Sequence, residues 1–362
     1  MYYDFPAIKP IRHLLVDPEI TEIMINGHGQ VFVERNGKMV LDDFTFPDDA
    51  HVRMLVDRMV EPTGRSITTA SPFVDFRLPD GSRVNVIVPP VAVCGPTVTI
   101  RKFTRTLTTV ENLIERGTLS QKMADLLCAS VQARLNIIFS GATGTGKTTT
   151  LGILSNAISE SERIVTIEDT AELDLQQIHV VSLESRPPNS EGKGEIVLSQ
   201  LVRNALRMRP TRIIMGEIRG DEALDMLQAI ATGHDGCLSV MHSSSPRDAV
   251  SRLEMMALSR GLMLPLWAIH RQISAAIDLI VQHEIFLDGV RRITHITQVC
   301  GLEGDQIGLR NIFEYKRTGQ DVSGRQVGQW ICNGVSDDFL PKFEKLGMAV
   351  PASVFNVGPE PA

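Results

Sequence analysis

Several features that mark other classes of protein are missing from this sequence of 362 residues. It contains no C-x-x-C pair and no metal-ligand spacing, because its five cysteines lie far apart, at Cys94, Cys128, Cys237, Cys300 and Cys332. An odd, scattered set of cysteines is typical of reduced thiols in the cytosol. The cysteines therefore argue against a disulfide framework or a zinc site and predict a cytoplasmic protein.

Long apolar runs and an excess of positive charge are missing as well. No stretch of about 18 apolar residues occurs, so we expect no membrane-spanning helix. Residues 1–15 show no basic region followed by an apolar core, which argues against a signal peptide. The net charge of −7 gives no strong nucleic-acid signal, although a local basic patch is still allowed. Any role at a membrane is then expected to act through partner proteins.

The length of the chain suggests two domains. Strand-like and helical segments mix in the first part, which predicts an N-terminal α+β domain over residues 1–104. A polar, Thr-rich stretch over 105–110 predicts the linker. The prediction of the N-terminal domain rests on strands near 20–26, 30–35, 73–78, 84–88 and 97–100, a helix over 48–60, and a hairpin at Asn36-Gly37.

Residues 111–362 show a different pattern, in which buried strands alternate with helices. That alternation predicts an α/β domain with a mostly parallel sheet covered on both faces. The region from about residue 291 is strand-rich again and is expected to be an appendage of this domain. The predicted buried strands lie at 135–140, 163–167, 179–183, 212–215 and 237–241.

The central feature is a glycine-rich stretch between the strand at 135–140 and a predicted helix. It follows the pattern G-x-x-x-x-G-K-[ST] in its required strand–loop–helix context, and the alternative is an ordinary Gly-rich turn. Glycines let successive N–H groups point at phosphate oxygens, and the helix N-terminus adds partial positive charge. Lys147 can then reach the phosphates, and the Thr148 hydroxyl can ligate Mg²⁺. The predicted nucleotide-binding residues are Gly141, Ala142, Thr143, Gly144, Thr145, Gly146, Lys147, Thr148 and Thr149.

Carboxylates follow two of the other predicted strands. Glu217 comes after the apolar run at 212–215, where hydrolytic P-loop enzymes place an acid that activates water. Glu168 and Asp169 end the strand at 163–167, and either carboxylate could hold Mg²⁺ through water. The alternatives are a surface carboxylate at Glu217 and, for Asp169, a cap on a following helix.

Two histidines bracket the strand at 237–241. His242 follows the strand and could sense the γ-phosphate by a hydrogen bond, whereas His234 precedes it. A lone histidine is otherwise a structural residue. We favour function for His242 and leave His234 open between the two interpretations.

Arginines of the first domain are the last candidates. An arginine from another domain or subunit often stabilises a transferring phosphoryl group. Arg83 follows a predicted turn and Arg101 ends a predicted strand. Each, taken alone, is a solvated surface charge.

Four blocks, in this order, resemble the type II/IV secretion superfamily of traffic ATPases. They are GATGTGKT, TIEDTAEL, RMRPTRIIMGEIRG and TGHDGCLSVMHSSSPRDAVSRLE. FVDFRLPDGSRVNVIVPP, TVTIRKF and the tail RRITHITQVCGLEGDQIGLRNIFEYKRTG are similar to one branch, the tight-adherence pilus assembly ATPases. The resemblance covers about residues 11–345. It implies a RecA-like second domain, ATP with Mg²⁺, a ring hexamer, and inner-membrane platform proteins that hold the ring at the membrane.

The resemblance also implies roles for single residues. Lys147 and Thr148 would hold phosphate and Mg²⁺, Glu217 would be the catalytic acid, and Glu168 would support it. His242, and less surely His234, would contact the γ-phosphate. The arginines that would approach the phosphates or flank the acid are Arg83, Arg101 and Arg219.

The expected function is therefore an ATPase motor that assembles or retracts a pilus or drives secretion. A conjugation or type IV secretion ATPase of the same superfamily is the first alternative. A nucleotide-gated scaffold with slow hydrolysis is another, and a small-molecule P-loop kinase is the last.

Overall fold

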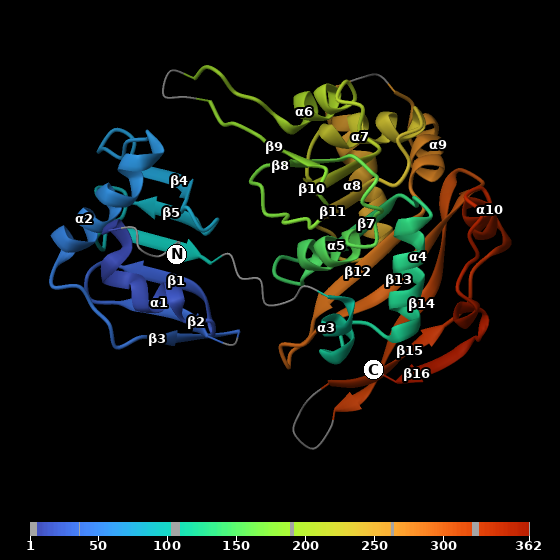
Figure 1. Cartoon of the computed structure of the whole chain (residues 1–362), viewed down its shortest axis with the longest axis horizontal. Helices are drawn as coiled ribbons and strands as arrows, with labels where there is room; N and C mark the ends of the chain where they lie inside the picture. The colour runs from blue at the N-terminus through green and yellow to red at the C-terminus, as the bar shows by residue number, and fades with distance from the viewer. Residues whose placement is uncertain are drawn as a thin grey trace. The chain divides into compact units, whose positions relative to one another are not determined.

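The computed structural model describes residues 6–35, 37–102, 109–188, 192–261, 264–320 and 326–361. The chain forms two units, Met1–Thr106 and Leu107–Ala362 (Figure 1). Asn36 of the predicted hairpin and residues 105–108 of the predicted linker lie outside the described residues.

The described part of unit 1 builds one antiparallel sheet with the order β3-β2-β1-β6-β5-β4. Buried residues alternate with more exposed ones along β4, β5 and β6, so one face packs on the helices and the other meets solvent. Helix α2 begins after Asp48, whose carboxylate accepts a hydrogen bond from the His51 amide at 2.9 Å. The elements are η2 Pro6–Ile11, α1 Arg12–Val16, β1 Ile20–Asn26, β2 Val31–Arg35, β3 Lys38–Leu41, α2 Asp49–Val60, η3 Glu61–Thr63, β4 Phe73–Arg77, β5 Arg83–Ile87 and β6 Thr97–Arg101.

Unit 2 is organised around a larger sheet with the order β16-β15-β14-β13-β12-β7-β11-β10-β8-β9. The strands from β12 to β9 pair in parallel, whereas β13 to β16 extend the same sheet in antiparallel pairs. The strand-rich tail of the chain thus continues the central sheet. The prediction of an α/β fold with a mostly parallel sheet is confirmed.

The first half of unit 2 contains the parallel strands that carry the site. Its elements are α3 Val110–Glu115, α4 Gln121–Gln132, β7 Ile137–Gly141, α5 Lys147–Ser155, β8 Ile164–Glu168, β9 Val180–Glu184, α6 Leu198–Ala205, β10 Arg212–Ile218, α7 Glu222–Ala231 and β11 Leu238–Met241.

The second half completes the sheet. Its elements are α8 Pro246–Ser259, α9 Leu266–Ala276, β12 Leu279–Ile285, β13 Arg291–Glu303, β14 Gln306–Gln320, β15 Gln326–Cys332, η4 Asp337–Phe339, α10 Leu340–Glu344, η5 Ala352–Phe355 and β16 Gly358–Pro361.

Helices cover both faces of this sheet, as Figure 1 shows. Phe139 and Leu151 belong to the core under α4 and α5, while Ile138 and Met215 belong to the core under α6 to α9. Successive residues of β7 therefore enter opposite cores, which explains why this strand is an unbroken apolar run.

A buried ion pair ties the amino ends of two of these strands together. Arg212, whose side chain is fully buried, donates to both carboxylate oxygens of Glu162 at 2.7 and 3.1 Å, and also to the Val131 carbonyl at 2.8 Å. Bidentate geometry fixes orientation as well as charge. This pair anchors the end of the sheet that lies away from the phosphate loop.

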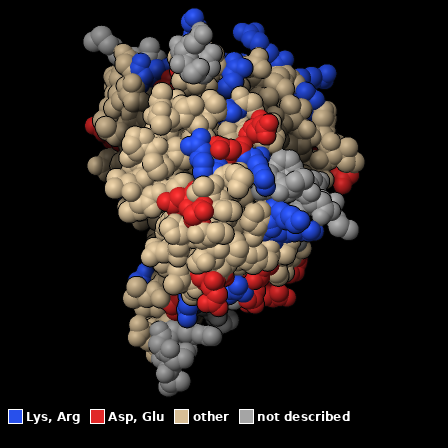
Figure 2. All heavy atoms as spheres, turned by 90° about the vertical axis from the view of Figure 1, so that its left-hand side faces the viewer, with Lys and Arg blue, Asp and Glu red and all other residues tan. Residues whose placement is uncertain are grey.

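Two surface observations bear on partners. No helix in the described residues is long and apolar enough to cross a membrane. On the face drawn in Figure 2, acidic and basic side chains lie close to one another among uncharged residues, in keeping with 36 basic and 43 acidic residues overall.

Candidate functional site

The phosphate loop joins the buried strand β7 to helix α5. Gly141 (φ +146°) and Gly146 (φ +93°) adopt backbone conformations that favour glycine. A Cβ at Gly141 would also collide with the carbonyl oxygen of His283 on the neighbouring strand β12. Ala142, Thr143 and Gly144 are exposed between these two glycines. The loop is therefore an open cradle before the N-terminus of a nine-residue helix, where anions bind favourably.

Lys147 is buried beneath this loop. Its Nζ donates to the Ala142 carbonyl at 2.6 Å. Burial lowers the pKa of Lys147 to about 8, and the Glu217 carboxylate opposes that shift. An anion in the loop would raise the pKa of this lysine again by stabilising its charged form, so the site fits a phosphate ligand. Next along α5, Thr148 is half-buried and Thr149 is exposed.

His242 and Glu217 come from the two strands next to β7 on one side, β11 and β10. Because these strands are parallel, their carboxyl ends meet at the edge that carries the loop. His242 Nε2 lies 3.4 Å from Glu217 Oε1. Burial, with the positive charges of Lys147, Arg252 and Arg219, lowers the pKa of His242, and a hydrogen bond to the Gly141 backbone opposes the shift. The structure thus brings Lys147, Glu217 and His242 together.

Arg219 lies on the other side of Glu217. Its Nη2 is 3.6 Å from Glu217 Oε2 and also forms an ion pair with the Asp169 carboxylate. The Ser185 hydroxyl donates to that carboxylate at 3.0 Å. The alternative that Asp169 caps a following helix is wrong, because the chain runs without a helix from Asp169 to β9. Asp169 instead holds Arg219 beside the acid.

Glu168 is buried at the end of β8. Its Oε1 accepts hydrogen bonds from the amides of Glu172 and Leu173, at 2.8 and 3.0 Å. Gly216 makes room for it, because a Cβ there would lie 2.6 Å from Glu168 Cγ. These contacts show Glu168 supporting the chain that leaves β8, and its role towards Mg²⁺ stays a prediction.

His234 lies at the other end of β11. The residue follows helix α7, and its Nδ1 is 3.2 Å from the Ala229 carbonyl. Strand β11 runs parallel to β7, with Leu238 opposite Ile137 and Met241 opposite Ser140. The length of β11 thus separates His234 from the phosphate loop of its own chain, so the structure does not bring it to the site. Its interactions are those of a helix end, which favours the structural interpretation.

Strand β12 carries residues that the sequence interpretation missed. It pairs with β7 on the side away from β11, with His283 opposite Gly141. His283 is buried, and burial lowers its pKa to about 4. Arg291, just beyond the following turn, donates from Nε to the Gly144 carbonyl at 2.7 Å. The sequence did contain one sign of these residues. The polar pair Gln282 and His283 follows the apolar run at 279–281, just as His242 follows β11.

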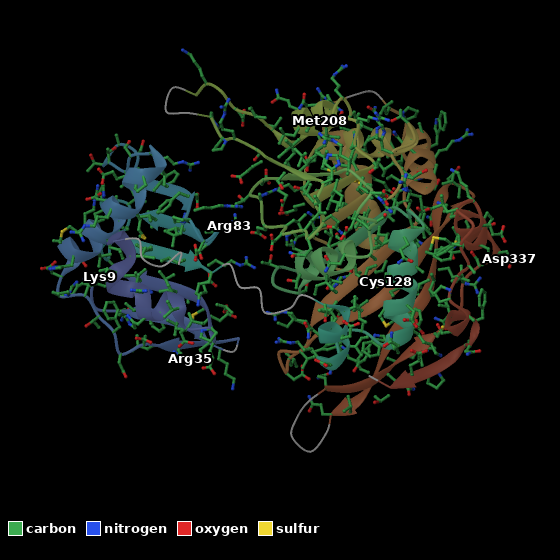
Figure 3. All side chains as sticks on the ribbon, viewed as in Figure 1. Lys9, Arg35, Arg83, Cys128, Met208 and Asp337 are labelled. Carbon is green, nitrogen blue, oxygen red and sulfur yellow. The ribbon has the colours of Figure 1, made fainter. Side chains whose placement is uncertain are left out.

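Three arginines of unit 1 form a row across its sheet. Arg77 pairs with Arg83, Arg83 with Arg101, and Arg101 with Glu22, so the four side chains share one face of β4, β5, β6 and β1. Figure 3 labels Arg83 at the start of β5. Like charges directly opposite one another are unfavourable, and the Glu22 carboxylate opposite Arg101 brings a negative charge to one end of the row. That Arg83 and Arg101 approach the phosphates stays a prediction.

The residues present fit ATP with Mg²⁺. The loop, the helix N-terminus and the buried Lys147 suit a polyphosphate. In the described part of the chain, no group of three or more His, Cys, Asp or Glu could hold a metal ion. The Thr148 hydroxyl would hold Mg²⁺ together with phosphate oxygens and water, and Mg²⁺ usually takes few protein ligands.

Comparison with known proteins gives the family. The model of a family described as "Type II/IV secretion system protein" matches residues 7–298. A putative conjugal transfer protein of Mycobacterium tuberculosis is 34% identical over 300 residues, covering 81% of this chain and 85% of its own. The type IV secretion system protein VirB11 of Brucella suis is 32% identical over 320 residues, covering 81% and 88%.

A solved structure shares the fold. The DotB ATPase of Yersinia pseudotuberculosis has a TM-score of 0.58 at 15% identity, covering 96% of this chain and 83% of that one. The family model spans most of the chain, and two relatives exceed 30% identity over four fifths of it. This chain therefore belongs to the type II/IV secretion system ATPase superfamily, as its four sequence blocks predict.

Proposed function

We propose that this chain hydrolyses ATP and works as the motor of a type II/IV secretion or pilus machine. The observation that carries the proposal is the meeting of Lys147, Glu217 and His242 at one edge of the sheet, beside an open phosphate loop. A buried cation for the phosphates and an acid beside them are groups that phosphoryl hydrolysis uses, and an imidazole next to the acid can hydrogen-bond to phosphate or water.

The residues divide the work as follows. Lys147 and the loop bind the β- and γ-phosphates, and Thr148 holds Mg²⁺, which neutralises charge on the phosphate oxygens when it is bound. Glu217 polarises the attacking water, and His242 contacts the γ-phosphate. Arg219, held by Asp169, keeps the Glu217 carboxylate in place through its ion pair.

Arg83 and Arg101 of unit 1 close on the same phosphates in the proposed cycle. Loss of the γ-phosphate removes the charge that attracts them, so the two units separate. In a ring of six chains, successive openings become mechanical work on polytopic inner-membrane platform proteins. The ring works in the cytoplasm, peripheral to the inner membrane.

The cargo has two candidates. The tail and first-unit blocks resemble tight-adherence pilus ATPases, which favours assembly or retraction of a pilus. The relatives named as conjugal transfer and type IV secretion proteins favour the alternative, a conjugation or secretion ATPase. Deleting the gene and scoring pili against DNA or protein export separates the two.

The proposal is tested by measuring ATP turnover together with oligomeric mass. We expect Mg²⁺-dependent turnover, loss of it in Lys147→Ala, and a hexamer stabilised by an ATP analogue. A hexamer with negligible turnover, even with membrane partners present, would favour the nucleotide-gated scaffold. A monomer that transfers phosphate to a small molecule would contradict the motor and favour the kinase.

A further inference from the structure

We propose that Gln282 is a positioning residue that ties the phosphate loop to His242. The inference rests on the proposed function, because it concerns how the hydrolytic groups keep their spacing. It starts from a buried polar side chain that the mechanism above does not use.

Gln282 lies on β12 directly opposite Ser140 of β7 and is 1% exposed. Its Oε1 accepts a hydrogen bond from the Ser140 hydroxyl, and its Nε2 donates to the Ser243 carbonyl at 3.3 Å. Ser140 directly precedes Gly141, the first residue of the loop, and Ser243 directly follows His242. One side chain thus holds both segments.

The order of the strands makes this bridge unusual. Strands β12 and β11 pair with β7 on opposite sides, so the glutamine reaches past β7 to the chain that leaves β11. A buried amide is costly unless its donor and acceptor are both satisfied, and here each has a partner. Through Gln282, the segment that carries His242 therefore resists a displacement of the loop. The loop likewise resists a displacement of that segment.

Replacing Gln282 with methionine keeps the volume and removes both hydrogen bonds. We expect Gln282→Met to lower kcat for ATP about tenfold, because the free energy of one or two hydrogen bonds is lost from the alignment of the groups. The KM for ATP should change less than about twofold, because Lys147 and the loop remain.

A matched control lies on the next strand. Gln298 of β13 is also buried, at 3% exposure, but its side chain bonds to Ser336, at 2.7 and 3.3 Å, away from the loop. Gln298→Met should lower the melting temperature by a similar amount and leave kcat unchanged. Equal losses of kcat in both variants would overturn the proposal, because the effect would then be one of general stability.

The tie to His242 is tested by combining substitutions. In a His242→Ala background, Gln282→Met should have little further effect on kcat. If the two losses multiply instead, Gln282 does not act through His242. Should Gln282→Met fail to fold, Ser140→Ala removes one of the two bonds and is judged by the same criteria.

A readout without catalysis separates this proposal from the proposed function. The pKa of His242, followed by NMR of labelled histidine, should rise towards the ordinary value in Gln282→Met, because the segment is held less tightly against Lys147 and the core. Gln298→Met should leave it unchanged. If the wild-type protein does not hydrolyse ATP, the proposed function is wrong, but the role of Gln282 can still be tested by this pKa. If the pKa of His242 is the same in Gln282→Met as in wild type, the proposal that Gln282 holds the His242 segment is wrong.

Discussion

His242 Nε2 lies 3.4 Å from Glu217 Oε1, although the two residues belong to the ends of different strands. Burial and the nearby cations hold the pKa of His242 below its usual value, so the imidazole is neutral at pH 7. A neutral imidazole beside the carboxylate can hydrogen-bond to phosphate or water without adding a charge. This pairing leads to the first prediction.

Replacing His242 should slow the chemical step more than it weakens binding. We expect His242→Asn to lower kcat about tenfold or more with little change in KM. The wild-type rate should also fall in acid, at a pH lower than an ordinary histidine would give, because the imidazole of lowered pKa takes up its proton there. Measuring kcat against pH for both proteins checks this. The decrease in kcat at low pH should be smaller in His242→Asn than in wild type, and an identical decrease in both would show that His242 does not cause it.

Lys147 should take up a proton when nucleotide binds. Its pKa of about 8 in the free protein means that it is partly deprotonated at pH 8, and a bound triphosphate should raise that pKa. We expect uptake of about half a proton per nucleotide at pH 8 and very little at pH 6. Calorimetry in buffers of different ionisation enthalpy measures it. Equal uptake at the two pH values would contradict the assignment.

His283 should make the stability of the protein pH-dependent. Its pKa of about 4 in the fold lies below the usual 6.5 of an unfolded chain, so the unfolded state binds the extra proton between those values. The free energy of unfolding should therefore fall as the pH drops from 6.5 to 4, by about 2 kcal/mol at pH 5 from this residue. Urea denaturation at pH 7 and pH 5 should show a smaller difference in His283→Gln than in wild type.

Two glycines of the loop should differ in their tolerance of alanine. Both Gly141 and Gly144 have positive φ, but only at Gly141 does an added Cβ meet other atoms, the His283 carbonyl oxygen and Thr145 Oγ1. Gly144→Ala should cost about 1 kcal/mol of backbone strain, and Gly141→Ala should cost about 2–3 kcal/mol more because backbone must move. Equal melting temperatures for the two variants would contradict this prediction, because they would show that β12 moves to make room for the added Cβ at Gly141.

Much of the site follows from residues that are close in sequence. The phosphate loop is one continuous motif, Glu217 follows the apolar run of β10 and His242 follows β11, so the rule for parallel strand ends predicts where they lie. The same rule fails for His234, because it precedes its strand rather than following it. The alternative of a helix cap at Asp169 was wrong because a capping residue alone does not make a helix without apolar periodicity behind it.

The residues from β12 and β13 were missed for another reason. Gln282, His283 and Arg291 lie about 140 residues from the loop, and only the order of the strands places them beside it. Apolar runs predict that a strand is buried but carry no information on which strand is its neighbour. An interpretation based on strand ends alone therefore finds the acid and the histidine but not the residues of β12 and β13 that contact the loop.

The central claim is that Glu217 activates the attacking water while Lys147 and the loop hold the nucleotide. The most direct test compares ATP binding and ATP turnover in Glu217→Ala, using a fluorescent nucleotide and phosphate release, with Lys147→Ala as the variant that should lose both. We predict that Glu217→Ala binds ATP within about threefold of wild type and hydrolyses it at least about 100-fold more slowly. Turnover at the wild-type rate in Glu217→Ala would contradict the account.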